Sequence, residues 1–169
     1  MTFKVQVHGF TFDARTAAMI AWAEAHAGFA FTIMQGSYNT GVAASAGTHN
    51  GGGAVDFSTK NLSPAKLNTM LGSLKDAGFA AWHRTAIAGV WPDHVHCIAI
   101  NGPDLAPLAA AQVKSFLAGR NGMADNGVDK SYRPKPPVLF DMKLGRPVAK
   151  PVAAPKPTTR QIRCHRRCP

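Results

Sequence analysis

The stretch THNGGGAVDFS, residues 48–58, places a histidine seven residues before an aspartate, with three consecutive glycines between them. Glycine loses more conformational freedom on ordering than any other residue, and it offers no side chain to bury. A run of three therefore predicts a sharp turn with a close approach to the backbone. The segment GGAVDFS (52–58) is predicted to be a strand that is entered through this turn. His49 and Asp56 then lie at the two ends of the turn and strand, where they can bind one ligand together.

Helical and strand patterns alternate on both sides of this segment. Each expected helix has an end signal: Asp13 and Gly28 flank the first, Ser63 and Gly78 the second, and Gly119 follows the third. The pattern predicts helices over residues 13–26, 63–77 and 104–118, and strands over residues 4–12, 29–35, 52–58, 80–85 and 94–100. We therefore expect an α+β domain with a small antiparallel sheet flanked by about three helices.

The net charge of +10 is concentrated at the C-terminal end of the chain. Residues 1–130 carry nine Lys and Arg against eight Asp and Glu, whereas residues 131–169 carry ten against one. The second segment is rich in proline and lysine and has neither hydrophobic period, although residues 138–140 (VLF) can dock on the domain. The expected organisation is a folded domain over 1–130 and an extended, disordered basic tail over 131–169.

Several classes of protein are disfavoured by the composition. The chain has no apolar run long enough to span a bilayer, and its start lacks the pattern of a secretory signal peptide. A specific nucleic-acid binder is not expected, because the body is nearly uncharged and the tail offers only two aromatic rings, Tyr132 and Phe140. Cys97 is expected to be a buried thiol, and the role of Cys164 and Cys168 is left open.

Polar side chains gather at the ends of the expected strands: His49, Asp56, Asp93, His94 and His96. A catalytic zinc takes three protein ligands of nitrogen or oxygen type and keeps one position open. It also needs a nearby group that accepts a proton. These five residues include the three ligands and the proton acceptor that such a site needs, although each of them alone is as readily a turn or core residue. The sequence therefore predicts a candidate metal site at the sheet.

Two half-motifs resemble the zinc-binding signature of the D-alanyl-D-alanine carboxypeptidase-type metallopeptidases. HNGGGAVD (49–56) resembles the first half, HxxGxAxD, and DHVH (93–96) resembles the second half, an acidic residue three before a histidine. QGSYN (35–39) is similar to the segment that lines the substrate cleft in that family. The resemblance covers roughly residues 10–120. Within the family, the chain looks most like phage endolysin peptidases.

The resemblance implies a role for each matched residue. The implied zinc ligands, for one ion per chain, are His49, Asp56 and His96, and the implied general base is Asp93. Contact with the substrate is implied for Gln35 and, less directly, for Ser37 and Tyr38.

The general base has a second candidate. On a regular strand His94 and His96 share one face while Asp93 points to the other, so Asp93 reaches the metal only if the chain turns near Pro92. The pair in HVH also resembles the HxH of lysostaphin-type peptidases, in which the first histidine assists the reaction. His94 is therefore the alternative base or oxyanion stabiliser, and His96 is a ligand in both cases.

The resemblance implies a zinc-dependent peptidoglycan peptidase that hydrolyses an L-alanyl–D-glutamate or D-alanyl bond. It also implies an endolysin that stays in the host cytoplasm until it reaches the cell wall, and we expect a monomer. The basic tail is a candidate anchor for anionic wall polymers. Two alternatives are a D,D-dipeptidase or carboxypeptidase acting on soluble peptides, and a non-catalytic zinc-bearing binding module.

Overall fold

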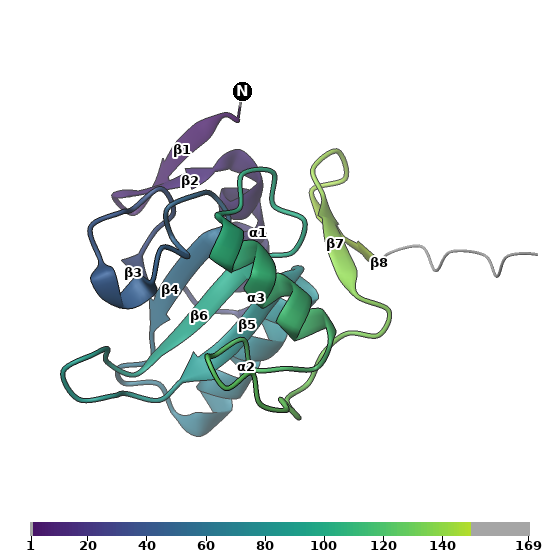
Figure 1. Cartoon of the computed structure of the whole chain (residues 1–169). Helices are drawn as coiled ribbons and strands as arrows, with labels where there is room; N and C mark the ends of the chain where they lie inside the picture. The colour runs from purple at the N-terminus through teal and green to yellow at the C-terminus, as the bar shows by residue number, and fades with distance from the viewer. Residues whose placement is uncertain (1, 150–169) are drawn as a thin grey trace, which may run out of the picture.

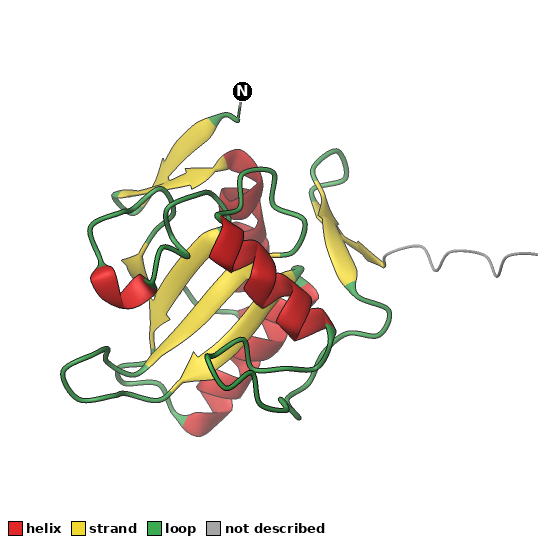
Figure 2. Ribbon diagram, in the orientation of Figure 1, coloured by secondary structure: helices red, strands yellow, loops and turns green. Residues whose placement is uncertain are grey.

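The computed structural model describes residues 2–149 and confirms the α+β class. A four-stranded antiparallel sheet has the order β3-β4-β6-β5. α1 and α2 cover one face of the sheet, and α3 crosses the other (Figures 1 and 2). The elements of this central layer are β3 (Ile33–Gln35), β4 (Ala54–Ser58), β5 (Phe79–Arg84), β6 (His94–Ala99), α1 (Ala14–Ala27), α2 (Pro64–Asp76) and α3 (Pro107–Leu117). A 3-10 turn, η1 (Ala43–Ser45), lies between β3 and β4.

The first two helices begin and end where local signals predict. The side chain of Asp13 accepts a hydrogen bond from the Thr16 amide at 2.9 Å, and Gly28 ends α1 with a φ of 76°. Ser63 caps α2. The expected strand over 4–12 is instead a hairpin of β1 (Lys4–Val7) and β2 (Phe10–Asp13), because the chain turns back at residues 8–9.

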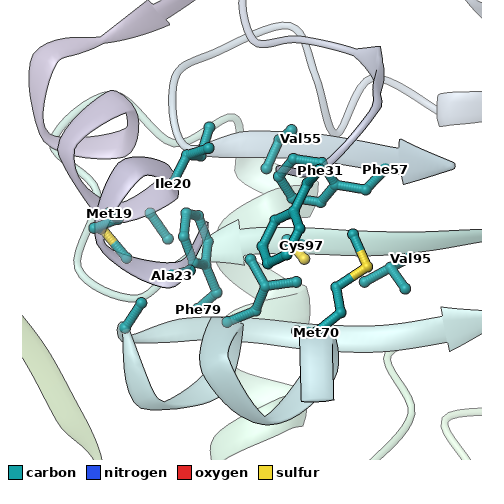
Figure 3. Packing of buried hydrophobic residues seen from close by; sticks show 14 of the residues in the cluster. Met19, Ile20, Ala23, Phe31, Val55, Phe57, Met70, Phe79, Val95 and Cys97 are labelled. Atoms are coloured by element: carbon teal, nitrogen blue, oxygen red, sulfur yellow. The ribbon is translucent and has the colours of Figure 1, made fainter. Parts of the chain in front are cut away.

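The register of β4 and β6 places alternate residues on two faces: an apolar face against α1 and α2, and a face toward α3 that carries polar side chains beside the apolar Ala54 and Ile98. Val55, Phe57 and Val95 are completely buried against α1 and α2, as Figure 3 shows. Asp56 lies directly opposite His96 and therefore shares the other face with it. Cys97 belongs to the apolar face and is fully buried, as predicted, and this burial raises the pKa of its thiol.

The glycine run packs against another part of the same chain. A Cβ on Gly51 would lie 2.2 Å from the carbonyl oxygen of Asp104, and Gly53 has a φ of +82°. The Gly52 amide donates to that same carbonyl at 2.8 Å. The close approach expected from the sequence is therefore made by the segment 104–106, which leads into α3.

Residues 131–149 pack on the body of the domain. They include a hairpin of β7 (Val138–Asp141) and β8 (Arg146–Ala149) (Figure 1). Phe140 is 3% exposed and belongs to the core between the sheet and α1. The expected extended tail thus begins with a structured segment, docked through the predicted VLF stretch. Residues 150–169, with Cys164 and Cys168, lie outside the described residues. No helix within residues 2–149 has the length and apolar character needed to cross a bilayer.

Candidate metal centre

Three predicted ligands meet on the polar face of the sheet. His49, Asp56 and His96 each offer one ligand atom, and these atoms all lie within 4.8 Å of one another. Asp56 and His96 face each other across β4 and β6, and His49 precedes the glycine run that leads into β4. All three are buried, with exposures of 0, 9 and 6% for His49, Asp56 and His96. This group can hold a metal ion.

The hydrogen bonding of His49 leaves one ring nitrogen free. Nδ1 lies 2.9 Å from the carbonyl oxygen of Gly36, so it carries the proton and donates it there. Nε2 of the neutral ring is then an acceptor. It is buried without a hydrogen-bond partner and lies 3.3 Å from Oδ2 of Asp56, which is also an acceptor. Two facing acceptors do not bond to each other, but a cation between them would satisfy both.

His96 is oriented from its far side by Gln112 on α3. The amide nitrogen of Gln112 donates to the carbonyl of Gly122 at 3.2 Å, which turns its Oε1 toward the ring of His96. His96 Nε2 therefore donates to that oxygen at 2.9 Å. Nδ1 lies within hydrogen-bond distance of Oδ1 of Asp56, at 2.6 Å, so a cation bound here would take the place of the proton between them. Metal-binding histidines characteristically donate their second N–H in this way.

The carboxyl group of Asp56 is held in its ionised form. Burial alone would raise its pKa, but the charge of His96, the hydrogen bond with that ring and the proximity of His49 outweigh burial and hold the pKa far below its usual range. A carboxylate and two imidazole nitrogens are a donor set that suits zinc. The group suits a metal ion because one carboxylate and two imidazole rings, all buried, converge where a cation would satisfy them.

The three ligands line the wall of an open cleft of about 820 Å³. Its other walls come from the segment around η1, the loop before β6, α3 and residues 122–126. Many of the lining side chains are apolar: Met34, Val42, Val90, Trp91, Leu108 and Met123. The cleft is large enough to take several residues of a peptide.

Two further predicted residues, Gln35 and His94, line the same cleft. The Gln35 side chain is fixed by the Ser45 hydroxyl, which donates to its Oε1 at 2.9 Å, and its Nε2 is buried without a partner. Nδ1 of His94 donates to the carbonyl of Pro92 at 2.7 Å, so Nε2 of the neutral ring is an acceptor. Within residues 2–149, the cleft lining thus leaves the amide N–H groups of Gln35 and the Nε2 acceptor of His94 without partners beside the candidate metal ligands.

Asp93 lies away from the cleft. It continues the alternation of β6 toward the opposite face, where its carboxylate accepts a hydrogen bond from the Thr59 hydroxyl and lies 2.7 Å from Nε2 of His83. The turn near Pro92 thus does not bring Asp93 round to the side of His94 and His96.

Ser37 and Tyr38 also lie outside the lining of the cleft. The Ser37 hydroxyl donates to the carbonyl of Ala54 at 2.8 Å, and the Tyr38 hydroxyl donates to Asp104 at 3.0 Å. Burial and the neighbouring Asp104 raise the pKa of Tyr38. These two side chains hold the loop after β3 against β4 and the segment before α3.

Two cleft residues, Gln112 and Arg84, were not predicted. Gln112 lies on the expected helix 104–118, but its contact with His96 depends on how that helix crosses the sheet. Arg84 follows Trp82 at the two-residue spacing of a strand, so alternation alone places both on one face. This two-residue spacing could have placed Arg84 beside the site from the sequence, once its strand was paired with residues 94–96 (HVH).

Comparisons of the chain with protein families, curated proteins and solved structures found no match.

Proposed function

We propose that this protein is a zinc-dependent peptidase that hydrolyses an amide bond in the stem peptide of bacterial peptidoglycan. One observation carries the proposal. Two imidazole rings and a carboxylate, all buried, converge in the wall of a peptide-sized cleft, and within the described residues Nε2 of His49 has no hydrogen-bond partner there. The resemblance of HNGGGAVD and DHVH to a zinc peptidase signature supports the same reaction class.

One zinc ion would be held by Nε2 of His49, the carboxylate of Asp56 and Nδ1 of His96. When bound, it would polarise a carbonyl group and lower the pKa of water from near 16 to about 7. Gln35 and Gln112 would not be ligands. Gln112 would keep His96 in the tautomer that leaves Nδ1 free.

The acid–base role is assigned to His94. Its Nε2 is an acceptor on the cleft side, so it can take a proton from the attacking water and return it to the leaving amine. The unused N–H groups of Gln35 Nε2 can donate to the carbonyl oxygen as negative charge develops there. Asp93 would have to leave Thr59 and His83 before it could act as the base.

The proposed biological setting is that of a phage endolysin. Such a protein would remain in the host cytoplasm until the membrane is breached and would then act on the cell wall, with the basic tail as a candidate anchor to anionic wall polymers. The bond is an L-alanyl–D-glutamate or a D-alanyl bond, and the experiment below distinguishes them.

The test is mass spectrometry of fragments released from purified peptidoglycan by the full-length protein. The zinc-loaded protein should create one new type of amino terminus, which identifies the bond. Chelation or His96→Ala should abolish release, and His94→Ala should lower the rate by about 10²- to 10⁴-fold.

The matched control is Asp93→Asn, which changes the neighbouring residue on the opposite face. It should retain activity if His94 is the base, whereas a comparable loss would return the role to Asp93. If zinc-loaded protein releases no fragments from several wall types, the peptidase is refuted and a zinc-bearing binding module is favoured.

A further inference from the structure

A buried cation without an acidic partner lies in the wall of the cleft. Arg84, the last residue of β5, is 8% exposed and lines the cleft together with the metal ligands. Among residues 2–149 its guanidinium makes one hydrogen bond, from Nη2 to the carbonyl of Asn121 at 2.8 Å. No carboxylate of the described chain forms an ion pair with it.

Burial lowers the pKa of Arg84, and the charges of Asp129 and Asp56, which form no ion pair with it, offset this only in part, so an anion supplied from outside would stabilise the guanidinium. A guanidinium remains charged in proteins, and a charge removed from water needs a partner to offset the lost hydration. The lining of the cleft contains one carboxylate, that of Asp56, and this group faces the two ligand histidines. The remaining fixed charge of the lining is therefore the positive charge of Arg84.

The guanidinium is held in place beside the metal centre. It lies over the ring of Trp82, with its central carbon 4.9 Å from the ring centroid, and the same ring stacks on His96 at 6.2 Å. Arg84 pairs directly with His94 across β5 and β6, so His96 is its diagonal neighbour. Diagonal neighbours on one face of a sheet are about 7–8 Å apart, which is within reach of a long side chain.

We propose that Arg84 binds a carboxylate of the substrate, so that the cleft selects peptides with a free acid one or two residues from the scissile bond. An extended peptide advances about 3.3–3.6 Å per residue, so two residues cover the separation of diagonal neighbours. Arginine matches a carboxylate with two parallel hydrogen bonds, and stacking on Trp82 fixes the plane of the fork.

The assignment rests on the proposed peptidase function and sharpens its substrate. For cleavage of the L-alanyl–D-glutamate bond of a peptidoglycan stem peptide, the free α-carboxylate of the γ-linked D-glutamate meets this requirement. Walls in which that carboxylate is amidated would be poorer substrates, because the amide has no negative charge to offer Arg84.

The test measures binding by calorimetry, independently of hydrolysis. The probes are the dipeptide γ-D-glutamyl-L-lysine and the same dipeptide with the α-carboxyl group of its glutamate amidated. Neither contains an L-alanyl–D-glutamate or a D-alanyl bond. The zinc-loaded full-length protein should bind the acid at least about tenfold more tightly than the amide. Arg84→Gln should remove this preference, and Arg84→Lys should restore part of it.

The matched control is Lys114→Gln, which removes one positive charge from the exposed side of α3 outside the cleft lining. It should keep the full preference. Circular dichroism must show that Arg84→Gln is folded, and Arg84→Lys serves as the test if it is not. Equal binding of acid and amide by the native protein, or an unchanged preference in folded Arg84→Gln, would overturn the assignment.

The two proposals fail in different ways. An acid preference that depends on Arg84, in a protein that releases no wall fragments, would support the carboxylate site and refute the hydrolase. Release of fragments without any acid preference would support the hydrolase and refute the role of Arg84.

Discussion

Gly51→Ala tests the close approach between the glycine run and the segment before α3. The added Cβ would lie 2.2 Å from the carbonyl oxygen of Asp104 and 2.6 Å from the amide nitrogen of Ala106, so backbone must move. Overpacking of this kind costs about 1–3 kcal/mol, and loss of the Gly52–Asp104 hydrogen bond about 1 kcal/mol. Alanine offsets about 0.4–1 kcal/mol by restricting the unfolded chain. We expect a net loss of roughly 2 kcal/mol in the free energy of unfolding.

The assay is urea denaturation of the metal-free protein, followed by far-UV circular dichroism. Gly72→Ala is the matched control, because Gly72 lies inside α2 and its Cβ would meet nothing within 4 Å. That substitution should stabilise the protein by about 0.5–1 kcal/mol. If Gly51→Ala changes the free energy of unfolding by less than about 0.5 kcal/mol, the contact does not have the steric role described here.

Three further predictions concern other contacts. Gln112→Leu should weaken zinc binding by about 10- to 100-fold, because His96 loses the acceptor that fixes its tautomer; competition with a chromophoric chelator measures this, and unchanged affinity would contradict it. Phe140→Ala should lower the free energy of unfolding by about 3–5 kcal/mol, whereas Leu144→Ala, at an exposed position, should change it little. Similar small effects of both would show that the hairpin is not part of the core. The pKa of Asp129 is lowered, since hydrogen bonds from Ser131 and contact with Arg133 outweigh burial. The contribution of the ionised Asp129 to the free energy of unfolding is therefore complete above the ordinary pKa of about 3.9 and is lost as pH falls below it. Urea titrations at several pH values should show that Asp129→Asn is less stable than the native protein near neutral pH and that the difference disappears in acid. A difference in the free energy of unfolding that stays constant with pH would contradict the assignment.

The elements that the sequence predicted well are those with local causes. Asp13 and Ser63 cap helices through contacts within three residues, so their role can be inferred without knowing the fold. The candidate metal ligands could also be predicted, because strand alternation places Asp56 on one face and the HVH triplet offers two histidines for the other strand. Pairing of β4 with β6 then puts Asp56 opposite His96.

The residues that were misplaced or missed depend on contacts between distant segments. The sequence argument for Asp93 required a turn near Pro92, whereas the chain continues the strand alternation and gives Asp93 to Thr59 and His83. Gln112 reaches His96 only because α3 crosses the sheet at that point. No local pattern describes such a crossing.

The beginning of the expected tail shows how composition can conceal structure. Residues 131–149 contain four prolines, and one of them, Pro147, lies within β8, so neither strand has a clear alternation. A two-stranded hairpin is marginal by itself. It is retained here because Phe140 enters the core.

The candidate metal centre is assembled from segments that lie far apart in the sequence. His49 is carried on a turn that closes against residues 104–106, and the orientation of His96 depends on a side chain of α3. During synthesis, before residue 112 has left the ribosome, the chain already contains His49, Asp56 and His96. It does not yet have the contact that orients His96. If the group binds zinc as proposed, zinc affinity would report whether these distant segments have come together, and a truncation before α3 should weaken it although His49, Asp56 and His96 are all present.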